Sequence, residues 1–266
     1  MKKLAVIGKD VSKSLSPQMH KFIAKHTGKQ LEYESISIPE SEFDNRIRNL
    51  FNEYDGFNVT IPYKLSIIPH LKKTEGDAEV FGAVNTVRVN DMSGHNTDGL
   101  GFMLMLKNNG VDVAGKDVLL LGAGGAGRSV AKKLADGGAN VFVYDTRYES
   151  AKNIENEFKG VKAIERVDCR PYFAIINATG IGMHNTEGLS PIGEDIIGKC
   201  ENAVDLIYTP KKSAFLQMAE RCGKRIINGE AMLFYQAYYA QCIFFETPAN
   251  EVEAKELFNK FTEELE

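Results

Sequence analysis

The chain of 266 residues carries 32 Lys and Arg against 36 Asp and Glu, a formal net charge of -4, and 43% hydrophobic residues. This composition is typical of a globular enzyme or binding protein with one or two domains. The mildly acidic balance offers no basic stripe for nucleic acid, and no run approaches the roughly 20 apolar residues of a membrane span. The four cysteines are far apart, which predicts reduced thiols in a cytoplasmic protein, without a disulfide framework or a metal site.

Strand and helix patterns alternate through the first hundred residues. The segment 41–54 places Ile47 and Leu50 on one side of a helix, whereas polar and apolar residues alternate along 31–38, as in a half-buried strand. Such alternation predicts an α/β domain in which helices cover a sheet. In chain order the patterns predict a strand over 3–8, a helix over 17–26 with Ser16 as its N-cap, a strand over 31–38, a helix over 41–54, a strand over 55–62 and a hairpin of 83–89 with 94–98.

A second α/β unit is predicted after a helical pattern over 101–110. Its first strand, 118–121, is followed by a glycine-rich loop, a helix and another strand, and later strand and helix patterns continue the alternation. The later strands are predicted over 172–179, 202–208 and 224–228. The apolar run 230–246 predicts a long helix that is buried on most sides, which we expect to pack back on the first unit.

Gly122, Gly124 and Gly127 form a G-x-G-x-x-G motif between a predicted strand and a predicted helix. In this setting the first glycine permits a tight turn, the second lets a pyrophosphate approach the backbone, and the third lets the helix pack close to the strand. The N–H groups and the positive dipole end of the helix then attract the phosphates. A glycine-rich turn without a ligand is the weaker interpretation, and the motif predicts a dinucleotide site.

Two residues near the end of the next predicted strand favour different cofactors, one NAD and the other NADP. Asp145 ends the next strand, about 20 residues after the first glycine, where a carboxylate bonds the ribose hydroxyls of NAD. Arg147 follows two residues later and is able to pair with the 2′-phosphate of NADP. A solvated turn with one acid and one base would explain the same two residues.

Several polar residues of the first unit have ordinary explanations when each is taken alone. Serines commonly populate polar loops, polar strand faces are commonly exposed, an aspartate commonly caps a helix, and a lysine is most often a solvated surface residue. The residues in question are Ser14, Ser16, Asn58, Thr60, Lys64, Asn85 and Asp98.

Taken together, the motifs of the chain resemble those of shikimate dehydrogenases. Eight segments occur in the order of that family and extend from Ser12 to Gln236. Eight segments in register are far more specific than any one of them. The segments are SKSLSPQMH, FNVTIPYK, GAVNTV, GHNTDGLGF, LLGAGGAGRS, NATGIGM, DLIYTP and NGEAMLFYQA.

Members of that family reduce 3-dehydroshikimate to shikimate with NADPH. The resemblance implies a substrate domain formed by 1–102 and 231–266, and a Rossmann NADP-binding domain formed by 103–230, with the last helix returning to the first domain. It implies that Lys64 and Asp98 are the catalytic pair. It also implies that the substrate is bound by that pair together with Ser14, Ser16, Asn58, Thr60, Asn85, Tyr208 and Gln236.

The chemistry of ketone reduction suits these residue types. Hydride transfer to a ketone leaves an alkoxide, which a lysine ammonium is able to stabilise and protonate. An adjacent carboxylate, Asp98, would hold Lys64 and balance its charge. Hydroxyl and amide side chains offer both donors and acceptors to a polyhydroxylated ring. No metal is required.

For the cofactor, the resemblance implies contacts from the glycine loop and from the nicotinamide pocket. NADP-using members often carry an Asn-Arg-Thr run where this chain has Asp145, Thr146 and Arg147, so NAD remains an alternative to NADP. Gly180 also stands where serine or proline is common in the family. The implied cofactor residues are Gly122, Ala123, Gly124, Gly125, Ala126, Gly127, Asp145, Arg147, Thr179, Met183, Gly229 and Met232.

The leading hypothesis is an NADP-dependent shikimate dehydrogenase of aromatic amino-acid biosynthesis. It would act on a small-molecule substrate as a monomer or homodimer, with neither nucleic acid nor a membrane as partner. A quinate/shikimate dehydrogenase that uses both NAD and NADP is the nearest alternative, because of Asp145. A non-catalytic, dinucleotide-binding regulatory protein is an alternative of a different class, but such a protein would need neither Lys64 nor Asp98.

Overall fold

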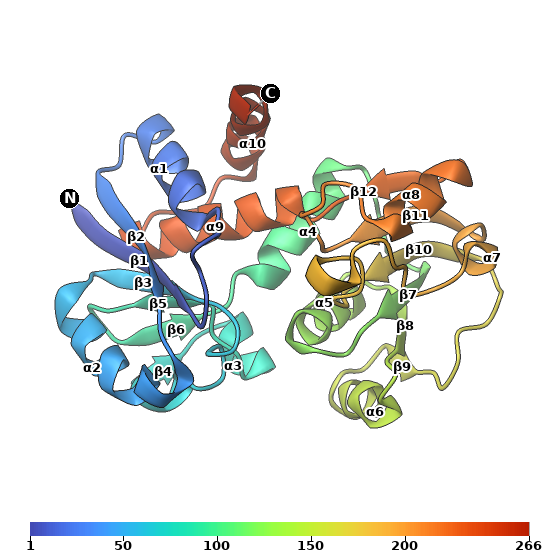
Figure 1. The fold of residues 1–266 in the computed structure, drawn as a ribbon, viewed down its shortest axis with the longest axis horizontal. Helices are drawn as coiled ribbons and strands as arrows, with labels where there is room; N and C mark the ends of the chain where they lie inside the picture. The colour runs from blue at the N-terminus through green and yellow to red at the C-terminus, as the bar shows by residue number, and fades with distance from the viewer. Residues whose placement is uncertain (266) are drawn as a thin grey trace. The chain divides into compact units, whose positions relative to one another are not determined.

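The computed structural model describes residues 1–265, and the chain forms two compact units (Figure 1). The first unit contains residues 1–101 and the C-terminal segment from Phe234, and the second contains residues 102–233. The chain leaves the first unit within α4 (Asp98–Asn108) and re-enters it within α9 (Glu230–Phe245). Each unit holds one six-stranded sheet. The prediction of two α/β domains, with the last helical segment returning to the first, is confirmed.

The sheet of the first unit has the strand order β2-β1-β3-β5-β6-β4. β1 pairs in parallel with β2 and β3, and β5 pairs antiparallel with both β3 and β6. β3 and β6 therefore run in the same direction, and the predicted hairpin of β5 and β6 is present. The strands are β1 (Lys2–Gly8), β2 (Leu31–Ser37), β3 (Gly56–Val59), β4 (Lys73–Thr74), β5 (Thr86–Arg88) and β6 (Ser93–His95).

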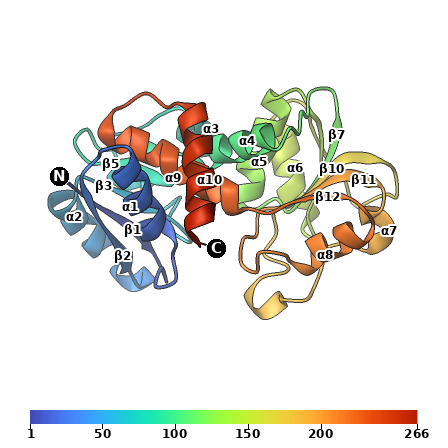
Figure 2. The same cartoon turned by 90° about the horizontal axis from the view of Figure 1, so that it is seen from above.

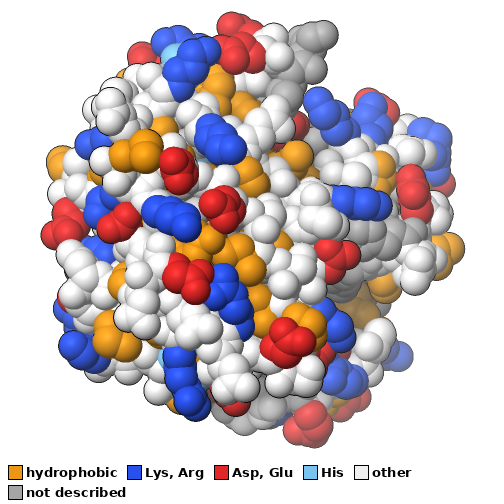
Figure 3. All heavy atoms as spheres, turned by 60° about the vertical axis from the view of Figure 1, so that its left-hand side comes forward, with side chains coloured by type: hydrophobic (Ala, Val, Ile, Leu, Met, Phe, Trp, Pro, Cys, Tyr) orange, Lys and Arg blue, Asp and Glu red, His pale blue; other side chains and the backbone are white. Residues whose placement is uncertain are grey.

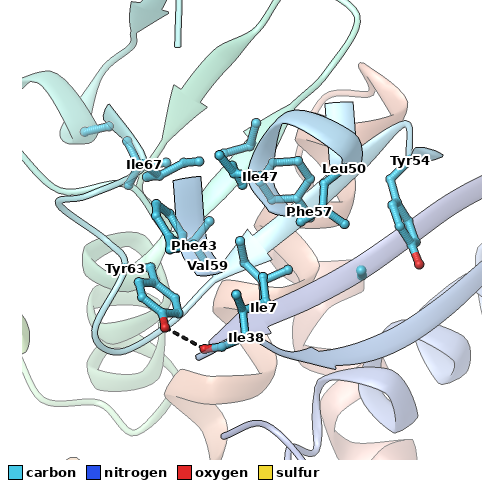
Figure 4. Close-up of a cluster of buried hydrophobic side chains, with 14 residues drawn as sticks. Ile7, Ile38, Phe43, Ile47, Leu50, Tyr54, Phe57, Val59, Tyr63 and Ile67 are labelled. Carbon is cyan, nitrogen blue, oxygen red and sulfur yellow. Dashed lines mark hydrogen bonds between the residues drawn. The ribbon is translucent and has the colours of Figure 1, made fainter. Parts of the chain in front are cut away.

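Helices cover both faces of this sheet, because side chains along β1 alternate between two apolar clusters. Ala5 and Ile7 face the cluster that α2 (Phe43–Glu53) completes, shown in Figure 4. Leu4 and Val6 face the opposite cluster, which contains residues of α9. The remaining helices of the unit are α1 (Ser16–His26), which contacts α10 (Glu251–Leu265), and the short α3 (Asp77–Phe81).

The start of α1 differs from the sequence prediction. Ser16 is the first helical residue and Leu15 holds the cap position, so the prediction of Ser16 as N-cap is wrong. The helix begins one residue before Pro17, and the hydroxyl of Ser14 accepts the backbone N–H of Ser16 at 3.2 Å. Ser14 thus satisfies a backbone donor that helix geometry leaves without an intrahelical partner.

The sheet of the second unit has the order β12-β11-β10-β7-β8-β9, and all of its pairings are parallel. β7 and β10 are neighbours at its centre, which is the point where the strand order reverses in a dinucleotide-binding fold. The strands are β7 (Asp117–Leu121), β8 (Asn140–Tyr144), β9 (Val161–Ala163), β10 (Tyr172–Asn177), β11 (Cys200–Asp205) and β12 (Arg225–Ile227).

Helices also cover both faces of the second sheet. α7 (Glu194–Ile197) and α8 (Ala214–Arg221) pack on one face, where Phe215 and Leu216 join residues of β7 and β10 in an apolar cluster. Figure 2 shows α5 (Gly125–Asp136) and α6 (Tyr148–Glu157) on the other side of the strands. The parallel strands are therefore buried on both faces, as an α/β layer structure requires.

The described surface is mixed in charge. Acidic and basic side chains alternate over the face drawn in Figure 3, and neither sign forms a continuous stripe there. Among the helices that the structure describes, none combines the length and the apolar character that crossing a membrane demands.

Candidate active site

One edge of the first sheet gathers most of the predicted substrate residues. Thr60 and Lys64 follow the carboxyl end of β3, Asp98 follows that of β6, and Asn85 immediately precedes β5. Because β5 is antiparallel to its neighbours, its start lies at the edge where β3 and β6 end. The loop with Ser14 and Ser16 follows β1, which is parallel to β3, and so leaves from this same edge.

An ion pair joins the two residues predicted to be catalytic. Nζ of Lys64 lies 2.6 Å from Oδ2 of Asp98. The lysine side chain is 27% exposed and the aspartate side chain 13% exposed. The pair is thus shielded from most solvent, while the lysine side chain stays partly exposed. A charge pair in such a position is stronger than one on the open surface, because water screens it less.

Lys64 is positioned by the buried residue before it. The hydroxyl of Tyr63 donates to the carbonyl of Ile38 at 2.6 Å, and its ring stacks on Phe43 with centroids 4.2 Å apart (Figure 4). The carbonyl of Lys64 accepts the backbone N–H of Val84 at 2.8 Å. These contacts fix the backbone on both sides of the lysine, so that its side chain extends from a rigid turn.

Asn85 holds the second oxygen of the aspartate. Its Nδ2 donates to Oδ1 of Asp98 at 2.8 Å and to Oγ1 of Thr97 at 3.1 Å, and it lies 3.5 Å from Oε1 of Gln236. Asn85 is 3% exposed. Because Asn85 and Lys64 bond different oxygens, the Asp98 carboxylate is fixed in two directions. The structure therefore brings together Lys64, Asp98, Asn85 and Gln236.

The other predicted substrate residues are less closely connected. Asn58 is buried and bonds the backbone carbonyl of Asn85. Ser14 and Ser16 bond each other through their hydroxyls at 3.1 Å. Thr60 is half-buried, with its N–H on the carbonyl of Ile7 at 2.9 Å.

Tyr208 belongs to the second unit, in a loop that a buried carboxylate organises. Asp205 accepts the N–H of Ile207 at 3.0 Å and the hydroxyl of Ser213 at 2.5 Å. Burial raises the pKa of Asp205 to about 6, and partial burial of the phenol also raises the pKa of Tyr208. Asn177 donates to Asp205 at 3.0 Å and accepts the hydroxyl of Thr179 at 2.6 Å. These bonds connect the segment of Thr179, a predicted cofactor residue, with the segment of Tyr208, a predicted substrate residue.

The glycine loop has the geometry that a dinucleotide needs. Gly122 has a φ of +99°, a conformation that glycine adopts without strain. A Cβ on Gly127 would lie 2.0 Å from the carbonyl oxygen of Gly122, so this position requires close backbone packing. A Cβ on Gly124 would meet no atom within 4 Å, so open space lies beside this residue, which is the N-cap of α5. The space beside Gly124 fits a phosphate that approaches the helix N-terminus.

The carboxylate of Asp145 makes two backbone hydrogen bonds at the end of β8. Its Oδ2 accepts the N–H of Ala123 at 2.8 Å and its Oδ1 accepts the N–H of Arg147 at 2.9 Å. The carboxylate therefore fastens the end of β8 to the glycine loop. The side chain of Arg147 is 81% exposed, and its Nε lies 4.0 Å from Asp145. The guanidinium is thus accessible to a ligand.

The remaining predicted cofactor residues of the second unit lie in the glycine loop, in the loop after β10 and around the start of α9. Ala123, Gly125 and Ala126 belong to the glycine loop and the first turn of α5, and Met183 is a half-buried residue of the loop after β10. Gly229 packs against backbone, since a Cβ there would lie 2.1 Å from the carbonyl oxygen of Leu206. Met232 is half-buried in the first turns of α9.

Sequence reasoning missed three residues of the first unit that bond the predicted site residues. Tyr33 donates its hydroxyl to Asn58 at 2.7 Å, Thr86 bonds both Asn58 and Asn85, and Thr97 donates its N–H to Asn85. Thr86 and Thr97 adjoin predicted residues in the segments AVNT and HNTD, which was the available signal. Among the described residues, no group of three or more His, Cys, Asp or Glu side chains is placed to hold a metal ion.

The family model and the curated relatives point to the same family. The family model described as the shikimate dehydrogenase substrate binding domain matches residues 6–87. The shikimate dehydrogenase (NADP(+)) of Carboxydothermus hydrogenoformans is 38% identical over 250 residues, which cover 88% of each chain.

Two solved structures have the same fold over almost the whole chain. The shikimate 5-dehydrogenase of Thermus thermophilus in complex with NADP(H) and shikimate has a TM-score of 0.88 and 32% identity, covering 98% of this chain and 99% of its own. The shikimate 5-dehydrogenase of Listeria monocytogenes in complex with shikimate and NAD has a TM-score of 0.82 and 27% identity, covering 97% and 96%. Sequence identity, fold and coverage thus agree, and this chain belongs to the shikimate dehydrogenase family.

Proposed function

We propose that the protein catalyses the reversible, NADP-dependent reduction of 3-dehydroshikimate to shikimate. The observation that carries the proposal is the Lys64–Asp98 ion pair of 2.6 Å, set among buried amide and hydroxyl groups at the carboxyl edge of a sheet. The substrate class comes from the relatives, since the T. thermophilus protein is bound to shikimate and NADP(H).

The ion pair suits the proton-transfer half of the reaction. When bound, NADPH supplies the hydride that reduces the carbonyl carbon. Nζ of Lys64 then donates a proton to the carbonyl oxygen as negative charge develops there, and solvent restores the proton to the amine. Asp98 keeps the ammonium in place and balances its charge in the partly shielded site. In the oxidation direction the neutral amine accepts the hydroxyl proton.

The polar residues around the pair support a hydroxylated, anionic substrate. Asn85 and Gln236 present amide groups beside Asp98, and amides both donate to and accept from hydroxyl groups. We assign the carboxylate of the substrate to the hydroxyls of Ser14 and Ser16, which lie in the loop after β1. Asn58, Thr60 and Tyr208 complete the proposed set of substrate contacts.

The second unit would hold the dinucleotide at its glycine loop. The open space at Gly124 and the N-terminus of α5 fit a pyrophosphate. We assign the 2′-phosphate of NADP to the exposed guanidinium of Arg147. We further place the reaction in the cytoplasm, because the four cysteines are all unpaired thiols.

A quinate/shikimate dehydrogenase that also uses NAD is the second candidate. It is favoured by Asp145, a carboxylate at the position where NAD-binding folds hold the ribose. The L. monocytogenes relative, which is bound to shikimate and NAD, supports the same cofactor.

Initial rates separate these candidates. NADPH oxidation with 3-dehydroshikimate tests the proposed activity. In the opposite direction, reduction of NADP and of NAD is measured with shikimate and with quinate. Among these four combinations, shikimate with NADP should have the highest kcat/KM. Comparable rates on quinate, or a preference for NAD, would favour the second candidate. Tight binding of cofactor and shikimate without turnover in any combination would contradict both and indicate a regulatory protein.

A further inference from the structure

The orientation of the Asn85 amide follows from its neighbours. The backbone N–H of Thr97, which can only donate, lies 2.9 Å from Oδ1 of Asn85. The other end of the amide, Nδ2, faces Oδ1 of Asp98 at 2.8 Å, and a carboxylate can only accept. Both partners require the same assignment. The oxygen of Asn85 therefore points away from Asp98 and its NH₂ group points toward it.

The orientation of the Asn58 amide is fixed in the same way. Its Nδ2 lies 3.1 Å from the backbone carbonyl of Asn85, which can only accept. Its Oδ1 receives the hydroxyl of Tyr33 at 2.7 Å. Tyr33 is 2% exposed, and burial raises its pKa well above the usual value, so the phenol keeps its proton and remains a donor.

Thr86 connects these two amides through a single hydroxyl. Its Oγ1 lies 3.0 Å from Nδ2 of Asn58 and 2.9 Å from Oδ1 of Asn85. Since Asn58 presents N–H there, the hydroxyl accepts from Asn58 and donates its proton to Asn85. Thr86 is fully buried, so water does not compete for these bonds.

The bonds form one directed chain from the interior of the sheet to the ion pair. Each link donates to the next, and the chain ends on the Asp98 carboxylate, whose other oxygen bonds Lys64. Hydrogen bonds that point the same way in a buried site polarise one another. The links run from Tyr33 through Asn58, Thr86 and Asn85 to Asp98.

We propose that Thr86 is a positioning residue, whose hydroxyl orients the Asn85 amide and thereby holds the Asp98 carboxylate in place for Lys64. The kinetic part of this inference rests on the proposed function of the ion pair. The geometric part rests on the hydrogen bonds alone. No contact of Thr86 with the substrate is needed.

Two substitutions isolate the hydroxyl. Thr86→Val keeps the shape and removes the hydroxyl, leaving Asn85 Oδ1 with its bond from Thr97. Thr86→Ser keeps the hydroxyl. We expect Thr86→Val to lower kcat for shikimate oxidation roughly tenfold, with KM for NADP unchanged, because displacing a reacting group by a fraction of an ångström has effects of this size. Thr86→Ser should retain kcat within about threefold.

Ser93→Ala is the matched control. Ser93 is a fully buried hydroxyl on β6 of the same sheet, but it bonds Asp91 at 2.8 Å instead of the site residues. We expect this variant to lower Tm while kcat stays at the wild-type value. If Thr86→Val behaves as Ser93→Ala does, with a lower Tm and an unchanged kcat, Thr86 is merely structural and the inference is wrong. Equal loss of kcat in Thr86→Val and Thr86→Ser would also overturn it.

Crystal structures of the wild type and Thr86→Val provide a readout that needs no substrate. We expect the variant to lose the 2.8 Å bond between Asn85 and Asp98 or to lengthen the 2.6 Å contact between Lys64 and Asp98. Unchanged distances would refute the positioning role. A wild type that fails to turn over 3-dehydroshikimate would refute the proposed function instead, and the structures would still decide the role of Thr86.

Discussion

Lys64 and Asp98, 34 residues apart in the chain, are joined by a 2.6 Å ion pair in which Asn85 bonds the second carboxylate oxygen. Lys64 lies in the segment after β3 and Asp98 is the first residue of α4, and both segments leave the same edge of the first sheet. The strand register thus determines the distance between the ammonium and the carboxylate.

Lys64→Met should abolish most of the turnover without changing cofactor binding. Loss of a general acid typically lowers kcat by about 10² to 10⁴, and methionine keeps much of the side-chain volume. NADPH oxidation with 3-dehydroshikimate measures kcat, and fluorescence titration measures the Kd for NADPH. Lys72→Met, an exposed lysine of the same unit, is the control and should retain full activity. A Lys64→Met rate close to that of wild type would contradict the assigned role.

Gly124→Ala and Gly127→Ala should separate binding from folding. A Cβ at position 124 meets no atom, so Gly124→Ala should be as stable as wild type or up to about 1 kcal/mol more stable. The same variant should bind NADP roughly tenfold more weakly, because the added methyl group occupies the space proposed for the phosphate. At Gly127 the Cβ would lie 2.0 Å from the Gly122 carbonyl oxygen, so we expect a loss of about 1–3 kcal/mol in the free energy of unfolding. Denaturant titration and calorimetric binding measure both effects. Normal NADP affinity in Gly124→Ala would exclude phosphate binding there.

Arg147→Ala should weaken NADP binding and leave NAD binding unchanged. The guanidinium is exposed and offers a charge-assisted bond to a 2′-phosphate, whose loss corresponds to roughly ten- to hundredfold in Kd. Arg166→Ala, an exposed arginine of the same unit, serves as control. Titration with NADP and with NAD gives the ratio of affinities. A ratio that does not change in Arg147→Ala would place the 2′-phosphate elsewhere.

His20→Phe should flatten the acid side of the stability profile. Burial lowers the pKa of His20 to about 3, whereas a histidine in the unfolded chain titrates near pH 6.5. Below about pH 6.5 the unfolded state therefore binds a proton that the folded state does not, and the free energy of unfolding falls as the pH drops, by about 2 kcal/mol at pH 5. Phenylalanine retains a ring to stack on Tyr33. Urea unfolding of both proteins at pH 7 and pH 5 measures the difference, and parallel losses would count against this account.

Asp205→Asn should have the opposite effect on the pH dependence. Burial raises the pKa of Asp205 to about 6, while an unfolded aspartate titrates near pH 4. The folded state retains the proton of Asp205 over this interval, so the contribution of this group to the free energy of unfolding is greatest below about pH 4 and falls by about 3 kcal/mol as the pH rises through about 6. The amide variant cannot ionise and should lack this decline. Unfolding of both proteins at pH 4 and pH 7 checks it, and an identical decline in the variant would argue against a raised pKa.

Local sequence patterns predict most of the strands and the dinucleotide loop, but they do not predict the helices α6 and α10. The apolar run of β1, the alternation along β2, the apolar stripe of α2 and the spacing of Gly122, Gly124 and Gly127 depend on residues close together in the chain. The sequence predicts the start of α1 one residue too late, because Pro17 is tolerated at more than one position of a first helical turn. Element ends depend on such local competition, and pattern alone resolves them poorly.

Residue patterns were enough to predict the fold class, the glycine loop and the polar residues that the family pattern singles out. The contact of Lys64 with Asp98, the bond of Asp145 to the glycine loop and the link of Thr86 to two amides became visible in the folded chain alone. These contacts escape sequence patterns because a hydrogen bond acts over about 3 Å and here joins residues distant in the chain. Strand register and loop geometry set those distances, and neither leaves a periodic signal in the sequence.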